Sequence, residues 1–121
     1  MIGLGIDAVD VARFRGVLER RPGIVERIFT VAERAPLEAR ADRVPGLAAR
    51  FAAKEAAMKA LGAGIGQVSW PELEVIRAAS GEPSLHLSGR AAGRAFELGV
   101  SSMSVSLTHT ASLAAAVVVT A

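Results

Sequence analysis

The chain has 121 residues, with 12 Arg and 2 Lys against 12 acidic residues, no cysteine and 51% apolar residues. This length and composition predict one domain, residues 1–121, built around a single core. The lack of cysteine excludes disulfides, cysteine-bound zinc and a thiol nucleophile. Two histidines, His86 and His109, are too few for most other transition-metal sites, so any metal would be held by oxygen.

Neither a membrane span nor a signal peptide is predicted. No segment approaches the roughly 20 consecutive apolar residues of a transmembrane helix. The first residues, MIGLGID, have neither a basic start nor a sufficiently long apolar run. We therefore expect a cytoplasmic protein with no membrane partner.

The formal net charge of +2 is distributed unevenly. Residues 11–54 carry ten basic groups against five acids, whereas residues 1–10 sum to −2 and residues 55–121 to −1. Such a positive segment speeds the encounter with an acidic partner, whether protein, nucleotide or nucleic acid. An Arg-rich and Ala-rich composition would by itself give the same pattern.

The first residues alternate between apolar side chains and glycine, which predicts a strand. One face carries Ile2, Leu4 and Ile6, and the other carries two glycines followed by Asp7. We interpret the apolar face as buried. The glycine face would let a ligand approach the backbone and leave Asp7 free to bind it, although an aspartate at a strand end is also a common turn or cap residue.

Helical patterns follow this strand. Asp10 can cap a helix with Val11, Phe14 and Leu18 on one stripe, which ends at Pro22-Gly23. Residues 24–29 predict another turn or two of helix. Residues 34–46 are polar and contain two prolines, which indicates a flexible connection.

Residues 47–61 (LAARFAAKEAAMKAL) predict the longest helix, with Gly62 at its C-cap. Glu55 and Lys59 lie together at its edge, a spacing that ordinarily stabilises a helix by ~0.2–0.5 kcal/mol. The expected apolar stripe consists of Leu47, Phe51, Met58 and Leu61.

The remaining sequence predicts two hairpins separated by a helix. Residues 73–89 indicate two strands around a Ser80-Gly81 turn, and residues 90–98 indicate a helix. Residues 103–109 alternate, and residues 113–119 are continuously apolar, as expected for a buried final strand. Two hairpins and a long helix predict an α+β fold, with a small antiparallel sheet packed on that helix.

The long helix also collects groups suited to phosphate chemistry. Both lysines of the chain, Lys54 and Lys59, lie beside Glu55, and the helix runs into the glycine-rich turn at residues 62–66. A divalent cation on carboxylates, a cationic side chain and glycine amides together can bind a phosphate. Because the helix C-terminus repels anions, side chains, metal and loop amides would have to hold it.

These segments together resemble the holo-acyl-carrier-protein synthases, a family of small bacterial 4′-phosphopantetheinyl transferases. The resemblance covers nearly the whole chain in the right order, and RFAAKEA-x-x-KA-x-G-x-G is its most specific motif. The matching pieces are GLGIDAVDVARF (3–14), IFTVAE (28–33), RFAAKEAAMKALGAGIG (50–66), the W…LEV…G-P hairpin (70–83) and VSLTHTASLAAAVVV (105–119).

The resemblance implies an α+β subunit with the phosphopantetheinyl transferase fold, assembled as a homotrimer with active sites between neighbours. The implied reaction transfers 4′-phosphopantetheine from coenzyme A to a serine of an acidic apo acyl carrier protein and releases adenosine 3′,5′-bisphosphate. It would require Mg²⁺ and serve fatty-acid or polyketide biosynthesis.

The resemblance also assigns residues. Asp7 and Glu55 become the Mg²⁺ ligands, and Lys59 completes the catalytic set by contacting phosphate. Either a water molecule or Glu55 would take the serine proton. The implied coenzyme contacts are Arg50, Lys59, Gly62, Gly64, Pro83 and His109, and the implied carrier-docking residues are Arg13, Arg20, Arg21 and Arg27.

Three positions depart from the usual pattern of the family. Glu82 replaces a lysine before Pro83, Ala63 replaces a threonine between two glycines, and Leu113 stands where an aromatic residue is common. None removes an implied metal ligand. We expect the transfer activity to persist. The affinity for coenzyme A is the property that these replacements would weaken.

Two other interpretations compete with a fatty-acid transferase. The chain could be a catalytically idle module that binds acidic carriers or nucleic acid through its basic segment. Few aromatics, two lysines and no stacking motif argue against nucleic acid. Alternatively, the same enzyme could serve a dedicated polyketide carrier.

Overall fold

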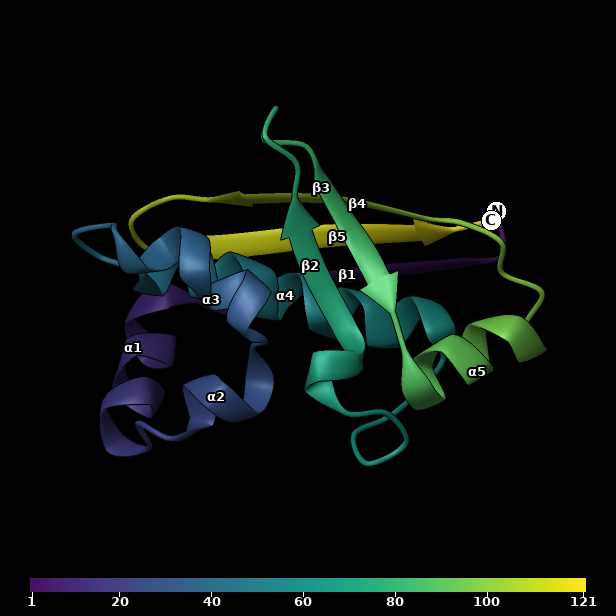
Figure 1. Cartoon of the computed structure of the whole chain (residues 1–121), viewed down its shortest axis with the longest axis horizontal. Helices are drawn as coiled ribbons and strands as arrows, with labels where there is room; N and C mark the ends of the chain where they lie inside the picture. Colours follow the sequence, from purple (N-terminus) through teal and green to yellow (C-terminus); the bar gives the residue numbers. More distant parts are fainter.

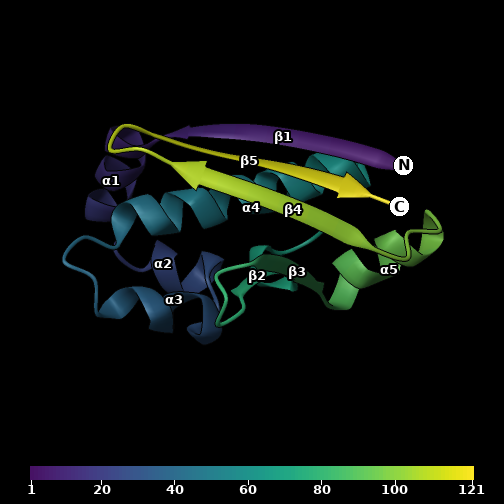
Figure 2. The same ribbon diagram turned by 90° about the horizontal axis from the view of Figure 1, so that it is seen from above.

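The computed structural model describes residues 1–121, and one long helix runs through its centre (Figure 1). A three-stranded antiparallel sheet in the order β1-β5-β4 lies along one long helix, α4 (Figure 2). The predicted α+β class and the packing of a small sheet on a long helix are therefore confirmed. The bounds are β1 Gly3–Asp10, β4 Met103–His109, β5 Leu113–Thr120 and α4 Val44–Leu61.

Strand β5 is the centre of this sheet, as its apolar sequence predicted. It pairs antiparallel with β1 from Gly3↔Thr120 to Asp10↔Leu113, and with β4 on its other side. Strands β1 and β4 are consequently the two edges. Both chain termini lie at the same end of the sheet (Figures 1 and 2).

The burial of β1 is the reverse of the prediction. Leu4 and Ile6 are 56% and 66% exposed, whereas the glycine face packs against α4. A Cβ on Gly5 would lie 1.8 Å from the Ala56 carbonyl oxygen, and one on Gly3 would lie 2.1 Å from that of Ala60. The glycines therefore admit the helix backbone and not a ligand.

Helix α4 begins three residues earlier than predicted, with Pro45 in its first turn, where a proline costs no backbone hydrogen bond. It is buried on almost all sides, so the predicted apolar stripe was too narrow. Small side chains make this possible, because alanine lets the sheet, the hairpin and the other helices approach closely. The fully buried alanines are Ala48, Ala49, Ala52, Ala53, Ala56 and Ala57.

Three short helices cover one end of α4: α1 (Val11–Arg20), α2 (Ile24–Ile28) and α3 (Val31–Glu38). Asp10 caps α1 by accepting a hydrogen bond from the Arg13 amide, as predicted. The prediction of a flexible connection at residues 34–46 is wrong, because α3 and the start of α4 occupy most of this segment. A capping box at Thr30 starts α3, and this helix ends only two residues beyond its internal Pro36.

The other predicted elements are confirmed. A 3₁₀ turn, η1 (Trp70–Glu72), leads into the hairpin β2 (Leu73–Arg77) and β3 (Pro83–Leu87), and α5 (Gly89–Glu97) follows. None of the helices is both long and apolar enough to cross a membrane.

Candidate active site

Asp7, Glu55 and Lys59 meet beneath the edge strand β1. The Lys59 Nζ lies 3.3 Å from Asp7 Oδ1 and donates a hydrogen bond to the Ile6 carbonyl at 2.8 Å. The Asp7 side chain is only 13% exposed, while that of Lys59 is 56% exposed. The structure therefore brings together the three residues to which the resemblance assigned catalysis.

The two carboxyl groups suit a divalent cation. Burial raises the pKa of Glu55, and the neighbouring Asp7 carboxylate raises it further, while Lys59 opposes this shift. Asp7 Oδ2 is buried without a hydrogen-bond partner. Two crowded carboxylates with an unused oxygen are a donor set that Mg²⁺ accepts. No cluster of three or more Asp, Glu, His or Cys residues occurs in the structure, so phosphate and water would supply the other ligands.

An open cavity of about 530 Å³ adjoins this carboxylate pair. Asp7 and Glu55 form one wall, and α1 forms the other with Arg13 at its rim. The aromatic ring of Phe14 stacks on that of Phe51 from α4, with centroids 5.3 Å apart, which fixes α1 against the catalytic helix. Arg13, implied in carrier docking, therefore lies at the carboxylate site itself.

A second, basic cavity of about 210 Å³ lies beneath β4. Arg50 is only 3% exposed, and its Nε has no hydrogen-bond partner, although Nη1 donates to the Gly46 carbonyl. Burial, together with the nearby Arg77, lowers the pKa of Arg50. No acid lines this cavity, whose walls include Arg40, Arg50, Arg77 and His109. Its chemistry is that of an anion site.

Arg40 and Arg77 are functional candidates that the sequence did not indicate. Arg40 lies in the segment predicted to be flexible, and nothing in its spacing pointed to Arg50. Arg77 stands opposite Pro83 in the hairpin register, and its Nη1 donates to the Gly81 carbonyl at 2.7 Å. Once the hairpin is predicted, its register with Pro83, an implied coenzyme contact, is the one sequence signal that could have indicated Arg77.

Helix α4 separates the carboxylate site from the basic cavity. Arg50 and Glu55 are five residues apart, which places them about 140° apart around the helix. Asp7 belongs to one edge strand and His109 to the other, and the two cavities share no lining residue. Within one chain, the predicted metal ligands and the predicted coenzyme contacts Arg50 and His109 are therefore not brought together.

The predicted glycine contacts lie in a third place, at the C-terminus of α4. Gly62 adopts the left-handed conformation (φ 61°) that ends the helix. It borders a cavity of about 480 Å³ with Arg90 and Arg94 of α5. Arg94 Nε donates to the Leu61 carbonyl at 3.0 Å, and Arg90 Nη1 donates to the Gly66 carbonyl at 3.0 Å. These two arginines offset the negative end of the helix dipole.

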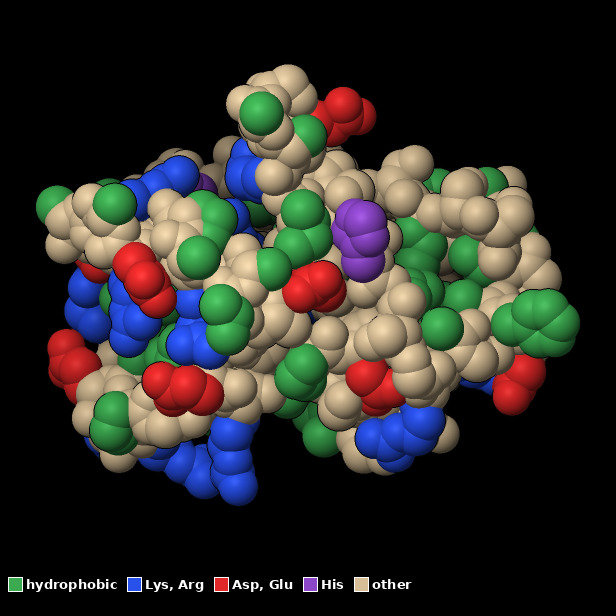
Figure 3. Space-filling model, viewed as in Figure 1, with side chains coloured by type: hydrophobic (Ala, Val, Ile, Leu, Met, Phe, Trp, Pro, Cys, Tyr) green, Lys and Arg blue, Asp and Glu red, His purple; other side chains and the backbone are tan.

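The four arginines implied in carrier docking are all exposed. Lys and Arg side chains gather over the end of the molecule that holds α1 to α3 (Figure 3). Arg21 and Arg27 also border a shallow depression at the turn between α1 and α2. The positive segment of the sequence is thus a positive surface.

None of the three departures from the family pattern lines the cavity at the carboxylate pair, although Leu113 pairs with Asp10, which does. Ala63 packs its methyl group in the core and also lines the cavity that Gly62 borders with Arg90 and Arg94. Glu82 is exposed at the hairpin tip, and Leu113 is 48% exposed on the outer face of the sheet.

Comparison with known proteins identifies the family. The family model described as "4'-phosphopantetheinyl transferase superfamily" matches residues 3–118. A holo-[acyl-carrier-protein] synthase of Clavibacter sepedonicus is 51% identical over 118 residues, which cover 98% of this chain and 93% of that protein.

Solved structures give the same result. The holo-[acyl-carrier-protein] synthase of Neisseria meningitidis has a TM-score of 0.89 at 31% identity, covering 100% of this chain and 98% of that one. The Helicobacter pylori synthase in complex with coenzyme A has a TM-score of 0.85 at 31% identity, covering 98% and 99%.

The chain belongs to the 4′-phosphopantetheinyl transferase superfamily. Within it, the chain is an enzyme of the holo-[acyl-carrier-protein] synthase group, a transferase.

Proposed function

We propose that this transferase moves 4′-phosphopantetheine from coenzyme A to a serine hydroxyl of an apo acyl carrier protein, with Mg²⁺ as cofactor. The serine oxygen forms a bond to the β-phosphorus of the coenzyme, the bridging P–O bond breaks, and adenosine 3′,5′-bisphosphate leaves. The serine proton is released to water or to Glu55.

The observation that carries this proposal is the meeting of Asp7, Glu55 and Lys59 beneath β1. Asp7 and Glu55 would hold Mg²⁺, which when bound neutralises charge on the pyrophosphate oxygens. Lys59 is exposed and stands beside Asp7, so its ammonium can turn from that carboxylate to a phosphate oxygen. The chain thus positions a polyanion and offsets its charge.

The basic cavity beneath β4 supplies the second half of the proposal. No acid lines this cavity of four basic side chains, and the buried Nε of Arg50 lacks a partner, which suits a phosphate group of the coenzyme. Arg77 is paired with Pro83, the residue that follows the exposed Glu82 on the same hairpin. It offers a cation where the family's usual lysine is missing.

A homotrimer would unite the two halves, with the carboxylate site of one chain facing the basic cavity of its neighbour. The outer face of the sheet supports such an assembly. It exposes Leu4, Ile6 and Leu113, and a shallow groove on it is lined mainly by apolar residues of β1, β4 and β5. Exposed apolar patches of this kind mark protein interfaces.

The partner would be an acidic carrier that docks on α1 and α2. The exposed arginines of these helices would raise the encounter rate with an acidic surface. Arg13 lines the same cavity as Asp7 and Glu55, which the carrier serine would have to approach. We propose cytoplasmic fatty-acid biosynthesis as the setting. A dedicated polyketide carrier is the alternative client, which rates on several purified apo carriers would distinguish.

Intact-mass spectrometry tests the reaction. An apo acyl carrier protein is incubated with this protein, coenzyme A and Mg²⁺, with EDTA in a parallel sample. We expect the carrier to gain one phosphopantetheine group, and EDTA to prevent the gain. No gain on any of several carriers, with folded protein, would instead favour a binding module.

A further inference from the structure

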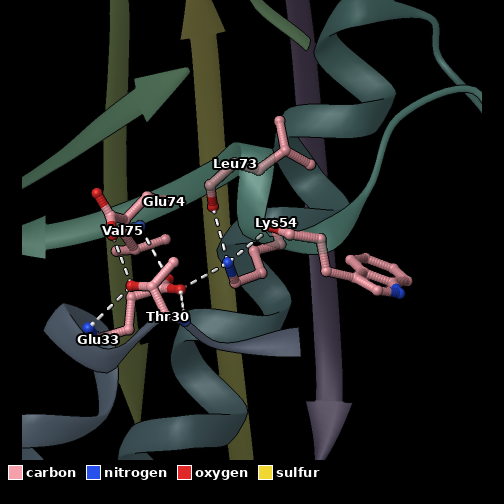
Figure 4. Close-up of polar contacts among 7 residues, drawn as sticks. Thr30, Glu33, Lys54, Leu73, Glu74 and Val75 are labelled. Atoms are coloured by element: carbon pink, nitrogen blue, oxygen red, sulfur yellow. Dashed lines mark hydrogen bonds and ion pairs between the residues drawn. The ribbon is translucent and has the colours of Figure 1, made fainter. Parts of the chain in front are cut away.

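A fully buried ion pair lies on the side of α4 away from β1. The Lys54 ammonium and the Glu33 carboxylate, both 0% exposed, approach to 2.8 Å. Lys54 Nζ also donates to the carbonyls of Trp70 (2.9 Å) and Leu73 (3.0 Å), which uses all three of its protons (Figure 4). The ammonium lies 5.7 Å from the centroid of the Phe29 ring.

Glu33 is equally well satisfied. Its Oε1 accepts a hydrogen bond from the Thr30 amide as well as from Lys54, and its Oε2 accepts one from the Val75 amide at 2.9 Å. The pair therefore joins four elements, α3, α4, η1 and β2, at one point (Figure 4). None of these groups contacts the carboxylate site.

Much of the buried surface of α4 is alanine, and these small side chains alone would pack almost as well after the helix turned about its axis. Its rotation therefore depends on the few larger groups. On the side of the carboxylate site these are Phe51, which stacks on Phe14, and Lys59, which donates to the Ile6 carbonyl. The contacts with Gly3 and Gly5 determine how closely β1 packs on α4, but they do not define the rotation of α4 about its axis. A buried polar pair does, because any rotation leaves charges unpaired.

We propose that the Lys54–Glu33 pair sets the rotation of α4 about its axis and thereby places Glu55 against Asp7. Glu55 is the next residue along the helix, about 100° around it. Lys54 is thus a positioning residue for the transfer reaction. The inference rests on the proposed function, because it assumes that Glu55 and Asp7 act together.

The test separates positioning from stability. Lys54→Met alone leaves a buried carboxylate unpaired and is expected to unfold at a much lower temperature. The double variant Lys54→Met/Glu33→Gln removes both charges while an amide still accepts from the backbone, so most of the melting temperature should return. We expect its kcat to stay about tenfold or more below wild type, because small displacements of catalytic groups are costly.

Further readouts identify the cause of this loss. The Mg²⁺ concentration for half-maximal rate and the dissociation constant of Mn²⁺, followed by its EPR signal, should both rise. The KM for the carrier should be unchanged, because the carrier docks on α1. Thr30→Ala is the matched control. It removes the bond from Thr30 Oγ1 to Glu74 and the bond from the Glu33 amide to Thr30 Oγ1 but leaves the three bonds of Lys54, and it should lower stability without changing kcat of the folded protein.

A double variant with recovered stability and wild-type kcat and Mn²⁺ affinity would overturn the inference. If the double variant does not fold, Glu33→Gln alone decides. It removes the negative charge and one of the two accepting oxygens of Glu33, and unchanged Mn²⁺ affinity in it would count equally against positioning. Failure of the proposed function is distinct, because the wild-type protein would then show no transfer at all.

Discussion

The carboxylate site beneath β1 and the basic cavity beneath β4 lie on opposite sides of α4 and would bind ligands of opposite charge. In the first, Asp7 has a buried oxygen without a partner although Lys59 is near. In the second, the buried Nε of Arg50 has no partner and no acid lines the cavity. One region therefore favours a cation and the other an anion.

Together, the two regions would suit a ligand that carries both a positive and a negative group. In the proposed function, a coenzyme pyrophosphate carrying Mg²⁺ would present a cation to one protein surface, and a further phosphate group would present an anion to the other. Because α4 separates the two regions within a chain, the comparison favours a site assembled from two chains. The following predictions are ordered from the largest expected effect to the smallest.

Removing either carboxylate should have the largest effect. Asp7→Ala and Glu55→Ala are each expected to lower the rate of transfer by about 10²–10³-fold or more, since the charge on the pyrophosphate is then no longer offset. Steady-state rates at limiting Mg²⁺ measure this. Asp42→Asn, which alters an exposed carboxylate paired with Arg15, is the control. Wild-type turnover in both alanine variants would refute the metal assignment.

Changes in the basic cavity should act on binding and not on chemistry. Arg77→Ala is expected to raise the KM for coenzyme A about 10- to 100-fold, the usual worth of a hydrogen bond to a charged group. The kcat should change little. Arg43→Ala, an exposed arginine outside this cavity, is the control. A normal KM with a reduced kcat would contradict a role in binding and would indicate that Arg77 acts on the reacting groups.

Charge reversal on α1 should affect the encounter with the carrier. Arg20→Glu is expected to raise the KM for the carrier several-fold and to flatten its dependence on salt, because surface charges steer association. Rates at low and at physiological ionic strength would reveal this. A variant that keeps the salt dependence of the wild type would place the docking surface elsewhere.

The smallest effect concerns stability. Burial and Asp7 raise the pKa of Glu55 in the folded protein, so the ionised carboxylate costs stability above that pKa, and protonation relieves the cost as the pH falls through it. Without metal, Glu55→Gln should therefore raise Tm slightly at pH 7 and much less under acid conditions. Thermal melts at both pH values test this, and a lower Tm at pH 7 would contradict it.

Local patterns predicted much of this molecule. The cap at Asp10, the glycine end of α4 and both hairpins follow from a few neighbouring residues, and the four-residue spacing placed Glu55 beside Lys59. Their association with Asp7 came from the resemblance to a known family. What failed depended on packing between distant segments. The two-residue alternation of a strand places Leu4 and Ile6 on the same face, yet it does not predict which face of β1 a helix will cover.

The basic cavity shows the same limit. Arg40 and Arg77 join Arg50 through the fold of a connecting segment and a hairpin, and no spacing in the sequence relates them. The buried partnership of Lys54 with Glu33 is a further example, since each residue alone reads as an ordinary helix-surface charge. Tertiary contacts of this kind become visible only in three dimensions.

Mixing two variants that are each impaired at low coenzyme A tests most directly whether the two regions act together across chains. Asp7→Ala lacks the carboxylate site and Arg77→Ala impairs the basic cavity, but a mixed oligomer can contain sites in which both halves are intact. At equal amounts about one quarter of the sites would be complete in a ring of identical interfaces. We predict that activity at low coenzyme A rises to that level. Mixed oligomers no more active than the separate variants would contradict a shared site.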